Sequence, residues 1–239
     1  MLYARYLDDI NGCIYDAIGE LKEKRILELG NQIIPGNEGI PEKTGKEYYT
    51  NRGVQHISVD LNGMDGAVKV DLSKPIKRSE WLGYFDVVTN VGTIEHVEPY
   101  KGQYQCFMNV HNCLKVGGVA IHFLPDNSEV EKWGWWKGHC NYFYSQEFIE
   151  MLAMENNYRV ISSKIIDGQI FCCLQKKKNT PFMENKKGFF KYIIKSKYGI
   201  IYPGIKSRFI TWLLCSTRPI RLRFGLTKYQ ILRKLENGK

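Results

Sequence analysis

Polar side chains stand at the ends of several apolar runs in this chain of 239 residues. Glu28 and Gly30 lie in the run RILELG, Asp60 ends the run VQHISVD, and Asn90 ends the run YFDVVTN. Ligands of open parallel sheets bind outside the carboxyl ends of the strands, so these residues could line one binding edge. The Asp60 carboxylate could accept hydrogen bonds from both hydroxyls of a ribose, and Gly30 would allow the backbone to approach closely. The chemistry expected at this edge is the binding of a nucleotide-like ligand.

Histidines supply candidate bases for taking a proton from an oxygen nucleophile, because their pKa lies near neutrality. His139 is the preferred catalytic candidate, since the segment GHCNYFYS lies between the fifth expected strand and the next helix, over the same edge. His96 is the second candidate, and its alternative is a structural role in the core. Three neighbouring aromatic residues could stack on a ring or sugar of a substrate, or pack beneath a long loop: Trp136, Tyr142 and Tyr144.

Alternating helix and strand patterns would position these residues. Helices are predicted at 7–22, 43–52, 99–115 and 146–156, and strands at 25–30, 54–60, 67–72, 84–90 and 119–125. Gly117 and Gly118 are expected to end the third helix. Two further strands, 159–166 and 169–176, are close enough to pair as an antiparallel hairpin around Asp167 and Gly168. The pattern predicts an α/β fold with a mostly parallel sheet, covered by helices on both faces and closed by that hairpin.

Basic residues are concentrated at the end of the chain. Residues 182–239 hold 14 lysines and arginines but only 2 acidic residues. The rest of the chain holds 20 lysines and arginines and 23 acidic residues, so its charge is close to balanced. We therefore expect a domain at 1–178 and a basic, aromatic-rich, helical C-terminal extension at 179–239. The extension could bind an anionic membrane surface, bind nucleic acid, or form a solvated basic face or an oligomer contact.

Composition favours a cytoplasmic protein. A hydrophobic content of 44% is normal for a globular chain, and no apolar run is long enough to span a membrane. The seven cysteines form no CxxC pair, which favours reduced thiols over a disulfide or zinc framework. The early acidic residues of MLYARYLDDI argue against a signal peptide. If the extension binds lipid, the protein would be peripheral at the inner membrane surface.

The order of these motifs resembles that of the class I S-adenosylmethionine-dependent methyltransferases over about residues 20–176. The specific part is FDVVTNVGTIEHV (85–97) followed by CLKVGGVAIHFLP (113–125), after the LELG strand and the aspartates at 60 and 71. The resemblance implies a Rossmann-like fold, S-adenosylmethionine as cofactor, and methyl transfer as the activity. Asp60 would bind the ribose and Asp71 the adenine amino group, while the backbone carbonyls of Asn90 and Val91 would face the amino group of the ligand. The cofactor-binding residues implied are Glu28, Gly30, Asn31, Gln32, Asp60, Leu61, Asp71, Leu72, Asn90 and Val91.

The loop after the first strand departs from the family pattern. Its sequence is ELGNQIIPGN, with Asn31 and Gln32 where small residues are common. Either these amides contact the carboxylate end of the ligand, or cofactor binding has been lost. The missing GxGxxG also counts against a nicotinamide-dependent dehydrogenase, because no second glycine admits a pyrophosphate. Instead of binding a cofactor, Asp60 and Asp71 could form turns after their strands, and Glu28 could cap the next helix.

Methylation of a hydroxyl on a small molecule, a saccharide or a lipid-linked glycan precursor is the expected activity, although a fold alone does not settle function. The alternatives are a catalytically silent binding or scaffold protein of this fold, and a nucleic-acid methyltransferase. The latter is disfavoured because no Asn/Asp-Pro-Pro-Tyr motif follows residues 84–90. In some related O-methyltransferases a pair such as Glu95 and His96 joins another acid to hold a metal. Val91 stands where that acid would be, so no metal is expected.

Overall fold

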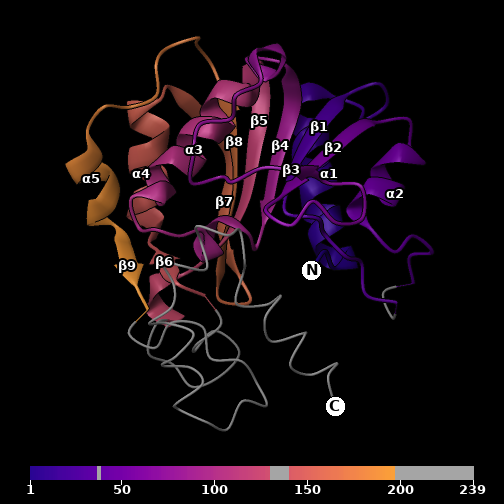
Figure 1. Ribbon diagram of the computed structural model, residues 1–239, viewed down its shortest axis with the longest axis horizontal. Helices are drawn as coiled ribbons and strands as arrows, with labels where there is room; N and C mark the ends of the chain where they lie inside the picture. The colour runs from indigo at the N-terminus through magenta and orange to yellow at the C-terminus, as the bar shows by residue number, and fades with distance from the viewer. Residues whose placement is uncertain (37–38, 130–139, 197–239) are drawn as a thin grey trace, which may run out of the picture.

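The computed structural model describes residues 1–36, 39–129 and 140–196. Within them, seven strands form one sheet in the order β3-β2-β1-β4-β5-β8-β7 (Figure 1). The strands are β1 (Arg25–Leu29), β2 (Gln55–Asp60), β3 (Val68–Lys69), β4 (Phe85–Val91), β5 (Leu114–Pro125), β7 (Tyr158–Ile166) and β8 (Gln169–Lys176). Strands β1 to β5 pair in parallel, and β8 pairs antiparallel with β5 and β7. The predicted mostly parallel sheet with a closing hairpin is confirmed.

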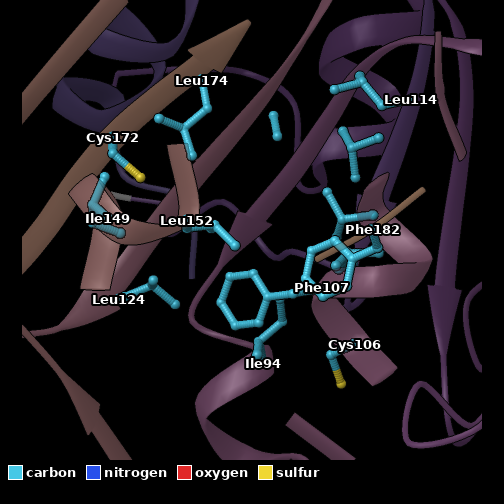
Figure 2. Close-up of a cluster of buried hydrophobic side chains, with 14 of the residues drawn as sticks. Ile94, Cys106, Phe107, Leu114, Leu124, Ile149, Leu152, Cys172, Leu174 and Phe182 are labelled. Carbon is cyan, nitrogen blue, oxygen red and sulfur yellow. The ribbon is translucent and has the colours of Figure 1, made fainter. Parts of the chain in front are cut away.

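Helices cover both faces of this sheet, as predicted (Figure 1). On one face lie α1 (Ala4–Ile18) and α2 (Gly45–Thr50), and on the other lie α3 (Gly102–Cys113) and α4 (Gln146–Glu155). Because side chains alternate along a strand, Ile26 of β1 packs with α1 while Leu27 joins the opposite cluster. Figure 2 shows part of that second cluster, where Phe107 and Leu152 pack together. Short 3-10 turns lie at η1 (Ser79–Trp81), η2 (Ile94–His96) and η3 (Asn127–Glu129).

Local sequence signals account for several boundaries. The Thr44 hydroxyl accepts a hydrogen bond from the Glu47 backbone N–H and begins α2. The Ser145 hydroxyl does the same for the N–H of Phe148 at the start of α4, as its predicted N-cap role requires. Asp167 and Gly168 both have positive φ, 51° and 72°, which suits the tight turn between β7 and β8.

The segment LKVGG differs from its prediction. Helix α3 ends at Cys113, and β5 already begins at Leu114, so the two glycines lie inside the strand. Leu114 pairs with Phe85 and Val119 pairs with Val87, so residues 115–118 form a bulge in the strand. A Cβ atom at Gly118 would lie only 2.7 Å from the backbone oxygen of Asp86. The glycines therefore permit a bulge against β4 and do not terminate the helix.

The first part of the basic extension packs onto the domain. Helix α5 (Lys186–Lys191) buries Phe189 beside Phe107 and Phe148, with ring centroids 5.6 and 5.2 Å away. Strand β9 (Ile193–Lys195) then pairs antiparallel with β6 (Tyr142–Tyr144). The helices expected farther along lie at residues 197–239, outside the described part, so the division at 178 stays a prediction. No helix among the described residues is long and apolar enough to cross a bilayer.

Candidate functional site

The carboxyl end of β1 bends sharply beside the end of β2. Gly30 has φ +79°, and its N–H donates to the Val59 carbonyl at 2.8 Å. The next N–H, of Asn31, donates to Oδ2 of Asp60 at 3.4 Å, and Oδ1 of Asp60 accepts from the Asn62 N–H at 3.0 Å. Asp60 thus takes part in a turn, its alternative role, and also lies directly against the glycine bend. A carboxylate has about four acceptor sites, so these bonds leave capacity for a ligand diol.

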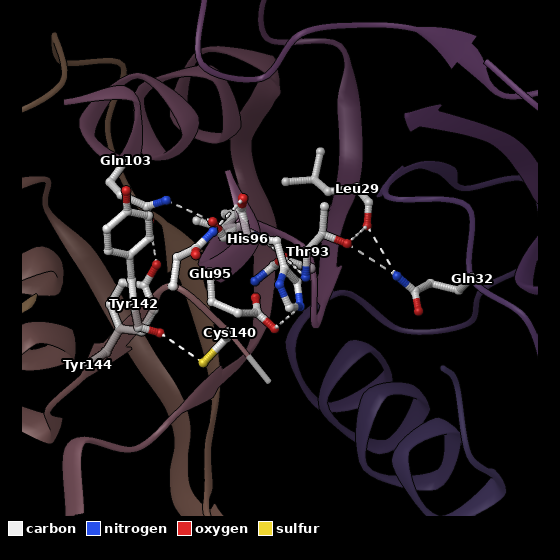
Figure 3. Close-up of polar contacts among 12 residues, drawn as sticks. Leu29, Gln32, Thr93, Glu95, His96, Gln103, Cys140, Tyr142 and Tyr144 are labelled. Carbon is white, nitrogen blue, oxygen red and sulfur yellow. Dashed lines mark hydrogen bonds and ion pairs between the residues drawn. The ribbon is translucent and has the colours of Figure 1, made fainter. Parts of the chain in front are cut away.

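Gln32 and Thr93 meet at the carbonyl of Leu29 (Figure 3), and both lie close to where a Cβ atom at Gly30 would be. The Thr93 hydroxyl donates to the Leu29 carbonyl at 2.7 Å, and Nε2 of Gln32 donates to the Thr93 hydroxyl at 3.3 Å. A Cβ atom at Gly30 would collide with that hydroxyl. Gln32 is buried, and its amide nitrogen lies 3.0 Å from where a Cβ atom at Gly30 would be.

Glu28 supports this loop from inside the sheet. Its side chain is buried, Oε1 accepts the Gln32 N–H at 3.0 Å, and Oε2 lies 3.6 Å from Nε2 of the buried His56. A Cβ atom at Gly45 would collide with Oε2, so α2 begins in direct contact with this carboxylate. Glu28 therefore holds the loop, and its contact with a cofactor stays a prediction.

The end of β4 is continued by η2. The Asn90 side-chain oxygen accepts the N–H groups of Thr93 and Ile94 at 3.2 and 3.0 Å, which turns the chain away from the buried Val91. Glu95 follows with an exposed fraction of 0%, and burial raises its pKa to about 8. His96, with 31% of its side chain exposed, places Nε2 at 3.6 Å from Oε1 of Glu95.

A segment far along the chain closes this turn. The Asn141 N–H donates to the Glu95 carbonyl at 3.1 Å, and its side-chain amide donates to the His96 carbonyl at 3.2 Å. Cys140 lies beside the Glu95 side chain (Figure 3), and its thiol donates to the Tyr142 carbonyl at 3.4 Å. Sequence reasoning assigned no site role to Thr93, Glu95, Cys140 or Asn141. The FDVV…EHV motif identified the turn after β4 as part of the site, but it gave no sign that residues 140 and 141 would contact that turn.

The two residues expected at the adenine end have local partners. Oδ1 of Asp71 accepts from the Ser73 hydroxyl at 2.6 Å, and Oδ2 pairs with Lys74 at 2.9 Å. Burial alone would raise the pKa of Asp71, but these hydrogen bonds hold it below its ordinary value. Leu72 is buried in the core beside α3, and Leu61 is half-buried after β2. Asp71 therefore forms a turn, its alternative role, and its adenine contact stays a prediction.

The aromatic candidates that the structure describes lie in the core. Tyr144 is fully buried and its hydroxyl donates to Gln103, while Tyr142 packs on Tyr100 with ring centroids 5.4 Å apart. These contacts correspond to the packing alternative, and a substrate contact by either residue stays a prediction. Trp136 and His139 lie outside the described residues.

Comparisons with known proteins support the architecture. No protein-family model matches the sequence, and no curated protein matches it. Among solved structures, the chain is similar to the N-methyltransferase NodS from Bradyrhizobium japonicum in complex with S-adenosylhomocysteine, with 10% identity, a TM-score of 0.50, and coverage of 74% of this chain and 89% of that one. It is also similar to an S-adenosylmethionine-dependent methyltransferase from Clostridium acetobutylicum, with 15% identity, a TM-score of 0.50, and coverage of 74% and 92%. The chain therefore has the fold of the class I methyltransferases.

Proposed function

We propose that this protein transfers a methyl group from S-adenosylmethionine to an acceptor. The observation that carries the proposal is the position of Asp60 against the Gly30 bend, at the carboxyl edge of a sheet with this fold. S-Adenosylmethionine, when bound, supplies an electrophilic methyl group on a sulfonium. Asp60 would accept hydrogen bonds from the ribose hydroxyls. Asp71 would contact the adenine amino group through Oδ2, since Oδ1 already accepts from both the N–H and the hydroxyl of Ser73.

The proposed acceptor is a hydroxyl of a small molecule or a saccharide, including a lipid-linked glycan precursor. An oxygen nucleophile is helped by a base whose pKa lies near neutrality, and a histidine has such a pKa. Among the described residues, His96 is the candidate, because it is partly exposed and follows the end of β4. His139, the preferred candidate from the sequence, lies outside the described residues and stays a prediction. Correct orientation of the acceptor would supply much of the remaining rate enhancement.

Binding of S-adenosylhomocysteine, the demethylated product, tests the proposal. At 100 times its dissociation constant the compound should raise the free energy of unfolding by about 2.7 kcal/mol, measured as a shift in thermal unfolding. Asp60→Asn should lose most of this shift, while Asp65→Asn, an exposed aspartate beyond the same strand, should keep it. Full stabilisation of Asp60→Asn would contradict the assignment of the ribose site.

A second candidate is a catalytically silent binding or scaffold protein of the same fold. It is favoured by the Gln32 and Thr93 side chains, which occupy the space over Gly30. This candidate predicts no stabilisation by S-adenosylhomocysteine at any concentration. A nucleic-acid acceptor would instead give oligonucleotide binding that weakens steeply with salt.

A further inference from the structure

Helix α1 lies along the closing hairpin of the sheet, and two contacts fix its register there. Oδ1 of Asp9 pairs with Nζ of Lys164 on β7 at 2.5 Å. The carbonyl of Ala17 accepts a hydrogen bond from Nε2 of Gln175 on β8 at 3.2 Å. Residues four positions apart lie on the same face of a helix, so these contacts stand one turn before and one turn after Cys13. Cys13 is therefore held against the hairpin.

The Cys13 side chain meets a second cysteine at this place. Cys173 lies on β8, and its thiol donates a hydrogen bond to the sulfur of Cys13. Ser162 of β7, which stands opposite Cys173 in the sheet, donates another. Cys172 is the neighbour of Cys173 in the sequence, but it belongs to the hydrophobic cluster on the opposite face, because side chains alternate along a strand. Of these two adjacent cysteines, Cys173 alone faces α1.

The two thiols differ in how readily they lose a proton. The hydrogen bond from Cys173 lowers the pKa of Cys13, and the one from Ser162 adds to the effect. Burial and the carboxylates of Asp9 and Asp16 act in the opposite direction without cancelling it. The hydrogen bond to Cys13, together with burial, raises the pKa of Cys173. Cys13 is therefore the thiol of the pair that ionises first, and the thiolate is the nucleophilic form of cysteine.

Cys13 is also the more accessible of the two. Its exposed fraction is 9%, whereas the other five cysteines that the structure describes have exposed fractions of 0–2%. Cysteines that respond to oxidants combine a lowered pKa and access to solvent with a second thiol nearby. Cys13 and Cys173 together meet these three conditions.

We propose that Cys13 and Cys173 are a peroxide-sensitive pair whose oxidation joins α1 to the sheet by a disulfide bond. The Cys13 thiolate attacks hydrogen peroxide, the O–O bond breaks, and the leaving hydroxide takes up the proton that the thiol had lost. The products are water and a sulfenic acid at Cys13. The sulfur of Cys173 then attacks the sulfur of Cys13, the S–O bond breaks, and the leaving hydroxide takes the Cys173 proton as a second water. Two thiols are oxidised, and one peroxide is reduced to two waters.

The disulfide would restrain the chain in two ways. Cys13 and Cys173 lie near opposite ends of the predicted domain in the sequence, and a cross-link over so long a loop strongly restricts the unfolded chain. The bond would also fix the helix that follows the N-terminal segment, in which the Leu2 N–H donates to the Ile33 carbonyl at 2.9 Å. Oxidation would therefore hold this segment more firmly on the loop after β1.

Treatment of the reduced full chain with one equivalent of hydrogen peroxide tests the proposal. The remaining thiols are alkylated, and the digested chain is analysed by mass spectrometry without reduction. We expect a cross-linked pair of peptides that carry Cys13 and Cys173, with two of the seven thiols lost and both regained in dithiothreitol. The cross-linked chain should unfold at a temperature about 5–15 °C higher than the reduced chain.

Three variants separate the two steps. Cys173→Ser should leave a sulfenic acid at Cys13, which dimedone labels, because the thiol that would resolve it is missing. Cys13→Ser should form no disulfide with Cys173 and should take up little dimedone at that residue. Cys172→Ala removes the neighbouring thiol on the other face of the sheet and should form the same cross-link as the wild-type chain. Stronger dimedone labelling of Cys173 than of Cys13 in these variants would contradict the choice of the attacking thiol.

Peptide mapping of the wild-type chain decides the proposal even if a variant does not fold. A disulfide that joins Cys13 or Cys173 to any other cysteine would overturn it, and so would a Cys13 that stays reduced. A sulfinic acid at Cys13 without a cross-link would show that Cys173 does not reach it. An unfolding temperature that is no higher in the cross-linked chain than in the reduced chain would overturn the proposed restraint of α1.

Discussion

At the scale of single residues, Gly30 is the position where backbone conformation and space act together. Its φ of +79° is in the left-handed region, and a Cβ there would meet the Thr93 hydroxyl. Gly83 offers a matched comparison, since its φ is +59° but a Cβ there would have no atom within 4 Å. Replacing Gly83 therefore measures the cost of a positive φ alone, and replacing Gly30 measures that cost together with the collision.

Gly30→Ala should lower the free energy of unfolding by about 2–4 kcal/mol, and Gly83→Ala by only about 1–2 kcal/mol. The larger loss arises because Thr93 must move and give up its hydrogen bond to Leu29. Urea unfolding of both variants measures the difference. Equal losses would mean that Thr93 yields without cost and that the contact over the bend is loose.

The burial of Glu95 leads to a prediction about stability. Burial raises its pKa from an ordinary value of 4.5 to about 8. Between these values the unfolded chain ionises first, so the free energy of unfolding falls by up to about 1.4 kcal/mol per pH unit. The loss is absent below the ordinary pKa and complete above the raised one.

Glu95→Gln should therefore gain stability relative to the wild-type chain as the pH rises from about 5 to about 8. Urea unfolding of both chains at several pH values gives the difference between their free energies of unfolding. The other titratable groups are common to both chains, so their contributions cancel in this difference. Glu155→Gln, which removes an exposed carboxylate at the end of α4, is the matched control. A constant difference for Glu95→Gln would mean that water or another partner reaches the carboxyl group in the free protein.

At the scale of elements, the bulge at 115–118 joins α3 to the central strand β5. Gly118 has no room for a side chain, because a Cβ would lie 2.7 Å from the backbone oxygen of Asp86 in β4. Backbone on a central strand cannot move without disturbing its pairs, so the collision cannot be relieved by a rotamer change.

Gly118→Ala should lower the free energy of unfolding by about 1–3 kcal/mol through this overpacking. Gly12→Ala in the middle of α1, where no atom lies within 4 Å, should instead raise it by about 1 kcal/mol through helix propensity. Opposite signs in thermal or urea unfolding would confirm the distinction. Stabilisation by Gly118→Ala would mean that β4 and β5 are not in contact at the bulge.

At the scale of the whole molecule, the basic extension is joined to the domain by an aromatic contact. Phe189 is fully buried against α3 and α4, so removal of every residue after 181 would expose core surface. A truncation after Ser196 keeps α5 and β9 and removes ten of the fourteen lysines and arginines of residues 182–239. It is therefore the appropriate variant for testing the proposed membrane contact.

The full chain should co-sediment with vesicles that contain anionic lipid and dissociate as salt is added, since each basic residue near the surface contributes about 1 kcal/mol. The chain that ends at Ser196 should remain in the supernatant. Neutral vesicles provide the control. Equal sedimentation of both chains would remove the proposal that residues 197–239 hold the protein at a membrane.

The order of strands and helices, the closing hairpin and the place of Asp60 beside Gly30 follow from the sequence alone. These features depend on alternation of apolar residues, on turn residues such as Asp167 and Gly168, and on the ends of strands, all of which are local in the chain. The LKVGG bulge was not predictable, because glycine pairs end helices and relieve strand contacts equally well, and only the oxygen of Asp86 distinguishes the two.

Tertiary structure alone decided the character of Glu95. In the sequence it is one acid before a histidine, and nothing local marks it as buried. In the fold, η2 turns it inward, and Cys140 and Asn141, more than forty positions away, close over it. The burial of a side chain depends on segments that are distant in the chain and meet only in the folded protein. The sequence therefore determined which groups reach this edge of the sheet, whereas packing determined that the Glu95 carboxyl group is shielded from water.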